Sequence, residues 1–328
     1  MSTLEKLYSP SEWSKRFKSP EMMSRYLIFA ADVTKKARNT TKCILDIPYG
    51  STERTKYDIY GTDLPDDAPI LIFIHGGYWQ EFSKDFAGFA VSVLVKNKIK
   101  VAVVGFDLCP DVKLKDIVSQ IKIAVEKIVS SAQNSGCRCV WIAGHSSGAH
   151  LTAALLHDTI WIKYMTELGY FKLIKGVLLI GGIYNIEPVV NTSYNEALKL
   201  TEDDIKEFSL TTLDTKEYAP IKNLKVIVTV GEYDSPIFIN ETREYAQVSV
   251  LLLYKINQIL MRYDKLIKHC CLFYSTLFLF CFCFQKAMSF VDKVEYILLR
   301  DIDHFDIVEN LLNADFVLTQ LIMQHMNA

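Results

Sequence analysis

The chain has 328 residues, of which 50% are hydrophobic and 23% are charged, and its formal net charge at pH 7 is −2. A chain of this length buries a large core, as one big domain or as two ordinary ones. Its balanced charge argues against a nucleic-acid partner and against attraction to an anionic membrane surface.

Two further features of the composition narrow the class of protein. The N-terminus has no apolar stretch of the kind found in secretory signals, so we expect a cytosolic protein. The eight cysteines form no C-x-x-C pair, and no histidine cluster lies beside them. We therefore expect free buried thiols, and neither a metal site nor a cofactor.

The first part of the chain combines polar residues with aromatic side chains. We expect residues 1–41 to form one or two helices that wrap around the domain. Short strands are expected at 43–47 and 55–60, on either side of a Pro-Tyr-Gly turn. The run 70–74 is wholly apolar and rich in β-branched residues, which indicates a strand buried on both faces.

Apolar strands and helical patterns alternate along the rest of the chain. Further strands are expected at 100–105, 139–143, 175–180, 225–230 and 294–299. Helices are expected at 114–129, at 149–156, and from about residue 305 to the end. The sequence therefore predicts one α/β domain over residues 1–328, with a mostly parallel central sheet and helices on both faces.

The pattern G-x-S-x-G follows one of these strands, as Gly144-His145-Ser146-Ser147-Gly148. In this pattern a serine lies on a sharp turn between a strand and a helix, and its hydroxyl is presented to the outside. Ser146 is therefore the candidate nucleophile. Ser147 is a weaker choice because the pattern is centred on Ser146.

A second motif, His75-Gly76-Gly77, follows the strand expected at 70–74. Backbone N–H groups of such a loop can stabilise a developing oxyanion, together with the N–H of the residue after the nucleophile. We expect Gly76, Gly77 and Ser147 to supply these groups. Glycine suits the site because a side chain would block the approach of a substrate carbonyl.

A serine nucleophile needs a base and an acid that orients the base. In open α/β sheets such groups lie in loops at the carboxyl ends of strands. His304 follows the last predicted strand and precedes the last helix, so it is the candidate base. Asp234 follows the strand at 225–230 and is the candidate acid, with Glu232 as its competitor.

These motifs resemble the esterase and lipase branch of the α/β-hydrolase superfamily. Residues 75–80 (HGGYWQ) look like the H-G-G-x-W motif of the kynurenine formamidases, or arylformamidases. Residues 8–14, 46–50 and 182–195 also resemble that family. The resemblance implies an α/β-hydrolase fold and hydrolysis of N-formyl-L-kynurenine to L-kynurenine and formate, in tryptophan catabolism.

Under this resemblance, Ser146 attacks the formyl carbon, and His304 takes the serine proton and passes it to the leaving aniline nitrogen. Water then hydrolyses the formyl-serine intermediate without a cofactor. Tyr78, Trp79 and Tyr184 are candidates for an aromatic wall around the aryl group. The family also suggests a homodimer. A broad-specificity carboxylesterase with the same triad and a non-catalytic binding protein of this fold remain alternatives.

Residues 248–285 do not fit the pattern. The segment is first basic and then strongly apolar, and it holds four of the eight cysteines. Its apolar run, 271–284, is shorter than the roughly 18 residues of a membrane span; a hairpin or lid that touches a membrane is an alternative. Without residues 248–285, two helical patterns join, and Asp234 and His304 are separated by 32 residues instead of 70. The segment is best explained as a retained intron or a gene-model error.

Overall fold

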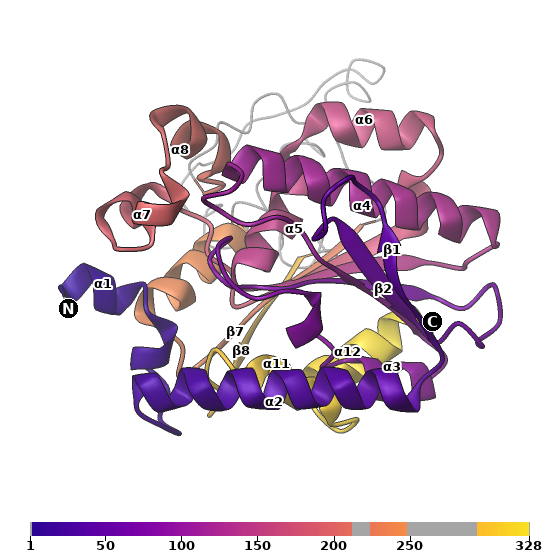
Figure 1. The fold of residues 1–328 in the computed structure, drawn as a ribbon, viewed down its shortest axis with the longest axis horizontal. Coiled ribbons are helices and arrows are strands. Elements are labelled where there is room, and N and C mark those ends of the chain that lie inside the picture. The colour runs from indigo at the N-terminus through magenta and orange to yellow at the C-terminus, as the bar shows by residue number, and fades with distance from the viewer. Residues whose placement is uncertain (1, 212–223, 248–293, 328) are drawn as a thin grey trace, which may run out of the picture.

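The computed structural model describes residues 2–211, 224–247 and 294–327. The anomalous segment 248–285 lies outside the described residues. Within these ranges a central sheet separates two layers of helices (Figure 1). The sheet has eight strands in the order β1-β2-β4-β3-β5-β6-β7-β8.

The strands follow the predicted order along the chain, with bounds that differ from the prediction by at most two residues. They are β1 (Cys43–Pro48), β2 (Lys56–Tyr60), β3 (Ile70–Ile74), β4 (Lys100–Val104), β5 (Val140–His145), β6 (Ile174–Ile180), β7 (Lys225–Gly231) and β8 (Val294–Leu299). β2 pairs antiparallel with β1 and with β4, and all other neighbours are parallel. The predicted mostly parallel α/β fold is confirmed.

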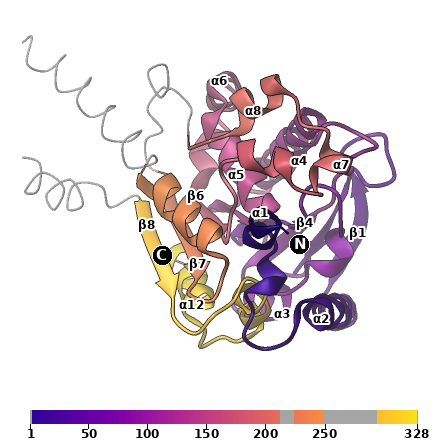
Figure 2. The same cartoon turned by 90° about the vertical axis from the view of Figure 1, so that its left-hand side faces the viewer.

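Helices cover both faces of the sheet (Figure 1). The upper face carries α4 (Leu114–Asn134), α5 (Ser147–His157) and α6 (Thr159–Glu167). Below the sheet lie α2 (Ser19–Thr40), α3 (Val91–Lys96), α11 (Asp306–Glu309) and α12 (Val317–Met326). Three shorter helices, α1 (Thr3–Leu7), α7 (Asn195–Leu198) and α8 (Glu202–Phe208), lie at one end of the molecule (Figure 2).

β3 illustrates why the apolar runs became central strands. All five of its residues are buried. Ile70, Ile72 and Ile74 belong to the core beneath one helical layer, whereas Leu71 and Phe73 belong to the core beneath the other. Side chains alternate between the faces of a strand, and each buried one stabilises the fold by about 1.5–3 kcal/mol.

The C-terminal helix is not continuous, and this part of the prediction was wrong. α11 ends at Glu309, a 3-10 turn (Asn310–Leu312) follows, and α12 begins only at Val317. The side-chain carbonyl of Asn313 accepts a hydrogen bond from the backbone N–H of Asp315 at 3.0 Å. Such a local bond offers the backbone a turn in place of the helix.

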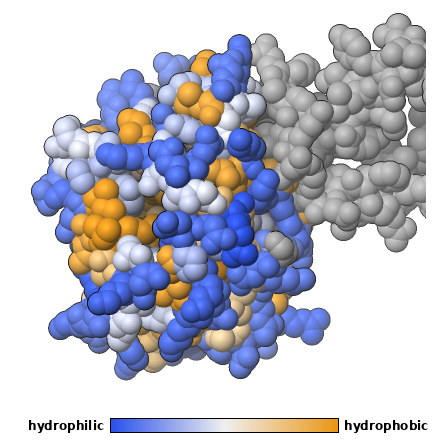
Figure 3. Space-filling model, turned by 90° about the vertical axis from the view of Figure 1, so that its right-hand side faces the viewer, coloured by the Kyte–Doolittle hydropathy of each residue, from blue (hydrophilic) through white to orange (hydrophobic). Residues whose placement is uncertain are grey.

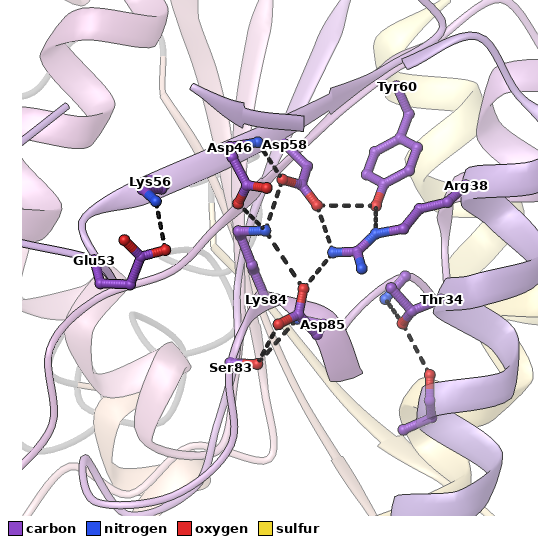
Figure 4. A network of polar contacts seen from close by, with 12 residues as sticks. Thr34, Arg38, Asp46, Glu53, Lys56, Asp58, Tyr60, Ser83, Lys84 and Asp85 are labelled. Carbon is purple, nitrogen blue, oxygen red and sulfur yellow. Dashed lines mark hydrogen bonds and ion pairs between the residues drawn. The ribbon is translucent and has the colours of Figure 1, made fainter. Parts of the chain in front are cut away.

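A network of ion pairs attaches α2 to the edge of the sheet (Figure 4). The Asp58 carboxylate on β2 is fully buried and accepts from Arg38 of α2 and from Lys84, each at 2.8 Å. Lys84 also pairs with Asp46 of β1 at 2.9 Å. A buried carboxylate with two cationic partners keeps its charge compensated, so α2 is held to β2 by polar contacts as well as by packing.

The face in Figure 3 is largely hydrophilic, with separate apolar patches. Within residues 2–211, 224–247 and 294–327, no helix has both the length and the hydropathy to cross a bilayer.

Candidate active site

Ser146 occupies the turn between β5 and α5, which is called the elbow below. Its backbone conformation is strained, with φ 56° and ψ −123°. Its N–H donates to the carbonyl of Ile180 at 2.8 Å, which ties the turn to β6. The flanking glycines allow this geometry, because a Cβ on Gly148 would lie 2.2 Å from the carbonyl oxygen of Ile74. A non-glycine residue with positive φ costs about 1–3 kcal/mol and is typical of functional sites.

The loop after β3, residues 75–81, turns back sharply on itself and is called the turning loop below. Gly77, Tyr78 and Trp79 all have positive φ, at 111°, 49° and 59°. The carbonyl of Gly77 accepts from the N–H of Glu81 at 2.8 Å and closes the turn. A Cβ on Gly77 would lie 2.3 Å from the Glu81 carbonyl oxygen, so this position requires glycine.

The candidates for the oxyanion hole are the backbone N–H groups of Gly76, Gly77 and Ser147. Gly76 is in close contact with the elbow, since a Cβ added to it would lie 2.9 Å from Ser146 Cβ. Ser147 is the first residue of α5, where the N–H has no partner within the helix. No described residue accepts a hydrogen bond from the N–H of Gly76, Gly77 or Ser147. Their role as an oxyanion hole remains a prediction.

The candidate base and acid are in direct contact. His304 lies in the loop after β8, and its Nδ1–H donates to Asp234 Oδ2 at 2.7 Å. The second oxygen of Asp234 accepts from the N–H of Ser235 at 2.7 Å. Glu232, the competing acid, instead accepts from the backbone N–H of Asp301 at 3.0 Å. Both Asp234 and His304 are almost fully buried. Their catalytic roles remain predictions.

His145 links the elbow to this loop, which the sequence did not indicate. Its Nε2–H donates to the backbone carbonyl of His304 at 2.8 Å. Burial, together with the nearby His304, holds the pKa of His145 well below its usual value, so the ring is neutral. A neutral ring with Nε2–H is the tautomer that this contact needs.

His75 supports the turning loop from behind. Its Nδ1–H donates to the carbonyl of Gly76 at 2.7 Å, and its ring stacks on Phe106 with 4.2 Å between centroids. Burial lowers the pKa of His75 to about 4. The ring therefore stays neutral at physiological pH and acts as a packing element of this loop.

Two of the three aromatic candidates are core residues, and this part of the prediction requires correction. Trp79 has no exposed surface and packs edge-on against His150 at 5.0 Å. Tyr184 is equally buried and stacks on Tyr245 at 4.2 Å. Neither ring has exposed surface, so neither presents a wall to a ligand in this structure.

Tyr78 is the candidate that keeps some exposed surface, at 8%. Its ring stacks on Tyr194 with 3.9 Å between centroids, and its hydroxyl donates to the carbonyl of Tyr8. Tyr78 therefore connects the turning loop to the N-terminal segment. In the part of the chain that the structure describes, no three His, Cys, Asp or Glu side chains are grouped to hold a metal ion.

Fold and elbow together define this chain as a hydrolase of the α/β-hydrolase class. A family model described as BD-FAE matches residues 57–250. The chain is 30% identical to the kynurenine formamidase of Salmo salar over 327 residues, covering 98% of this chain and 95% of that protein. It belongs to the kynurenine formamidase family, as the motifs predicted.

Solved structures agree on the fold. A protein from Silicibacter sp. TM1040 is 22% identical, covers the whole of both chains and has a TM-score of 0.69. A thermostable carboxylesterase cloned from a metagenomic library is 15% identical, with a TM-score of 0.59 over 95% of this chain and 96% of that one. At these identities the likeness concerns the fold alone.

Proposed function

We propose that the chain hydrolyses N-formyl-L-kynurenine to L-kynurenine and formate through a formyl-serine intermediate. The observation that carries the mechanism is the buried hydrogen bond between His304 and Asp234, in a fold that presents Ser146 on a strained turn. The near full-length similarity to a kynurenine formamidase supports the substrate.

In the first half of the reaction, Ser146 Oγ attacks the formyl carbon while His304 Nε2 takes the hydroxyl proton. Asp234 accepts the Nδ1–H, holds that tautomer and stabilises the imidazolium. The tetrahedral oxyanion accepts hydrogen bonds from the free backbone N–H groups of Gly76, Gly77 and Ser147.

In the second half, the C–N bond breaks and His304 Nε2–H protonates the departing aniline nitrogen, which releases L-kynurenine. A water molecule then attacks the formyl ester, with His304 again acting as base. The ester C–O bond breaks, Ser146 recovers its proton, and formate leaves. Formyl is the smallest acyl group, so the acyl side of the site needs little room.

The direct test compares turnover of N-formylkynurenine and p-nitrophenyl acetate by the full chain. We expect Ser146→Ala to lower kcat/KM for N-formylkynurenine by about 10³-fold or more and to abolish labelling by a fluorophosphonate. Ser119→Ala, on the exposed side of α4, is the matched serine control and is expected to keep both.

Two outcomes would favour the alternatives. Turnover of the ester with none of the formamide would identify a carboxylesterase with the same residues. A folded protein that the fluorophosphonate does not label would be a binding protein of this fold.

We also propose that the enzyme works without a metal or cofactor, in the cytosol, as a homodimer. The absence of metal-ligand motifs from the sequence supports the first statement, and the family resemblance supports the last. Dialysis against a chelator is expected to leave formamidase activity unchanged, and light scattering on the purified protein measures the mass of the assembly.

A further inference from the structure

Asp303, the neighbour of the proposed base, is a buried carboxylate with five hydrogen bonds. Two of them come from the backbone on the far side of His304. The N–H groups of Phe305 and Asp306 donate to Asp303 Oδ1 at 2.8 and 2.9 Å. In return, the Asp303 N–H donates to Asp306 Oδ1 at 2.6 Å. The Asp303 side chain therefore sets the turn that carries His304.

The other three hydrogen bonds come from the N-terminal segment, 287 or more residues away in the chain. Ser14 Oγ and Arg16 Nε donate to Asp303 Oδ2 at 2.6 and 2.8 Å. Arg16 Nη2 donates to Oδ1 at 3.0 Å. Arg16 thus forms a bidentate ion pair with the carboxylate, which is the strongest geometry for this pair.

Arg16 forms ion pairs with three acidic side chains. Besides Asp303, Arg16 Nη1 contacts Glu309 at 2.6 Å, and its Nε lies 3.7 Å from Asp306. Although burial opposes ionisation, the hydrogen bonds from Arg16 and Ser14 hold the pKa of Asp303 well below its usual range. Asp303 is therefore a charged acceptor that depends on the N-terminal segment for compensation.

The same segment contacts the other loops of the site. The carbonyl of Tyr8 accepts from Tyr78 of the turning loop, and the carbonyl of Leu7 accepts from Ser235 Oγ, beside Asp234. Figure 2 shows α1 and the chain that follows it in front of the strands, between α7 and α2. The N-terminal segment therefore reaches all three loops that follow β3, β7 and β8.

We propose that Ser14 and Arg16 are positioning residues for the catalytic base, acting through Asp303. Losing their three hydrogen bonds leaves the Asp303 carboxylate buried with its backbone donors alone, and the turn around His304 loosens. A misplacement of about 1 Å in a reacting group costs on the order of 10²-fold in rate. This inference rests on the proposed role of His304.

The test measures the second-order rate of Ser146 labelling by a fluorophosphonate, a reaction that needs the base but no particular substrate. We expect Arg16→Ala to lower this rate and kcat for N-formylkynurenine by about 10–100-fold, with KM changed less than about threefold. Arg16→Lys, which keeps the charge but not the two-pronged contact, is expected to restore part of the loss.

Arg138→Ala is the matched control, because Arg138 precedes β5 and forms an exposed pair with Asp67. It is expected to react at the wild-type rate. A folded Arg16→Ala that labels at the wild-type rate, or a loss accounted for by the unfolded fraction, would overturn the proposal. Should Arg16→Ala not fold, Ser14→Ala carries the same test with one hydrogen bond removed.

The two proposals fail in different ways. A wild-type chain that is labelled at Ser146 but does not hydrolyse the formamide contradicts the proposed substrate and leaves the labelling comparison valid. If His304→Ala leaves the labelling rate unchanged, His304 is not the base, and Ser14 and Arg16 then have no base to position.

Discussion

The buried carboxyl group of Glu241 joins separate parts of the molecule through hydrogen bonds. It lies on the helix that begins at Pro236. One oxygen accepts from the N–H groups of Tyr184 and Asn185, at 2.6 and 2.9 Å, and the other from the Tyr8 hydroxyl at 3.1 Å. Burial is the main reason that the pKa of Glu241 rises to about 7.

The raised pKa of Glu241 predicts that the stability of the fold depends on pH. Between its ordinary pKa of 4.5 and its folded value of about 7, the native state holds the proton more tightly than the unfolded chain. The free energy of unfolding therefore falls as pH rises through this window. Glu241→Gln cannot titrate, so we expect it to remove about 1–3 kcal/mol of the difference between pH 4.5 and pH 7.

Urea unfolding at several pH values measures this slope. Glu196→Gln, at an exposed position on α7, is the matched control and should keep the wild-type slope. Identical slopes in the wild type and Glu241→Gln would mean that the native carboxyl does not take up a proton in this window.

The contribution of each ion pair of α2 to stability depends on how far the pair is buried. Asp58 is fully buried between Arg38 and Lys84, whereas Glu21 and Arg25 form a pair along the exposed side of the same helix. Desolvation makes the buried charges interdependent, while water and salt screen the exposed pair. The two pairs should therefore respond very differently to loss of the acid.

We expect Asp58→Ala to lower the free energy of unfolding by about 3–5 kcal/mol, because the largely buried Lys84 loses its one fully buried acidic partner and keeps only the exposed Asp46 and Asp85. Glu21→Ala should cost less than about 1 kcal/mol. Chemical denaturation of both variants measures these changes in the free energy of unfolding. Equal, small losses would show that water compensates Lys84 and Arg38 after the substitution.

Taken as a whole, the molecule needs only a short connection between β7 and β8. These strands are parallel neighbours, paired from Val226 with Val294 to Gly231 with Leu299. A parallel pair needs one crossover helix, and the helix that begins at Pro236 starts that crossover. Residues 248–285 therefore exceed what the topology requires.

A chain that lacks residues 248–285 is expected to fold and to hydrolyse N-formylkynurenine at least as well as the full chain. Removing an apolar segment should also reduce aggregation. Activity assays and light scattering on both chains provide the comparison. An active full chain with an inactive shortened chain would contradict the prediction. Finding those codons in the dominant mature transcript would contradict the explanation of residues 248–285 as a retained intron.

Local sequence patterns carried much of the fold and part of the site. The apolar runs predicted the central strands, because burial on both faces favours apolar residues. The two strands β1 and β2 were predicted as short strands on either side of a turn. The elbow around Ser146 and the positions of Asp234 and His304 after strands were also readable, since they depend on short spacings. The break before α12 was not, because one turn at Asn313 outweighs a helical pattern.

Tertiary structure decided the contacts between distant residues. It paired His304 with Asp234 rather than Glu232, and it turned Trp79 into the core. It also placed Arg16 on Asp303, 287 residues later in the chain. Spacing along the sequence specifies which residues share an element, whereas packing of elements against the sheet specifies which side chains meet.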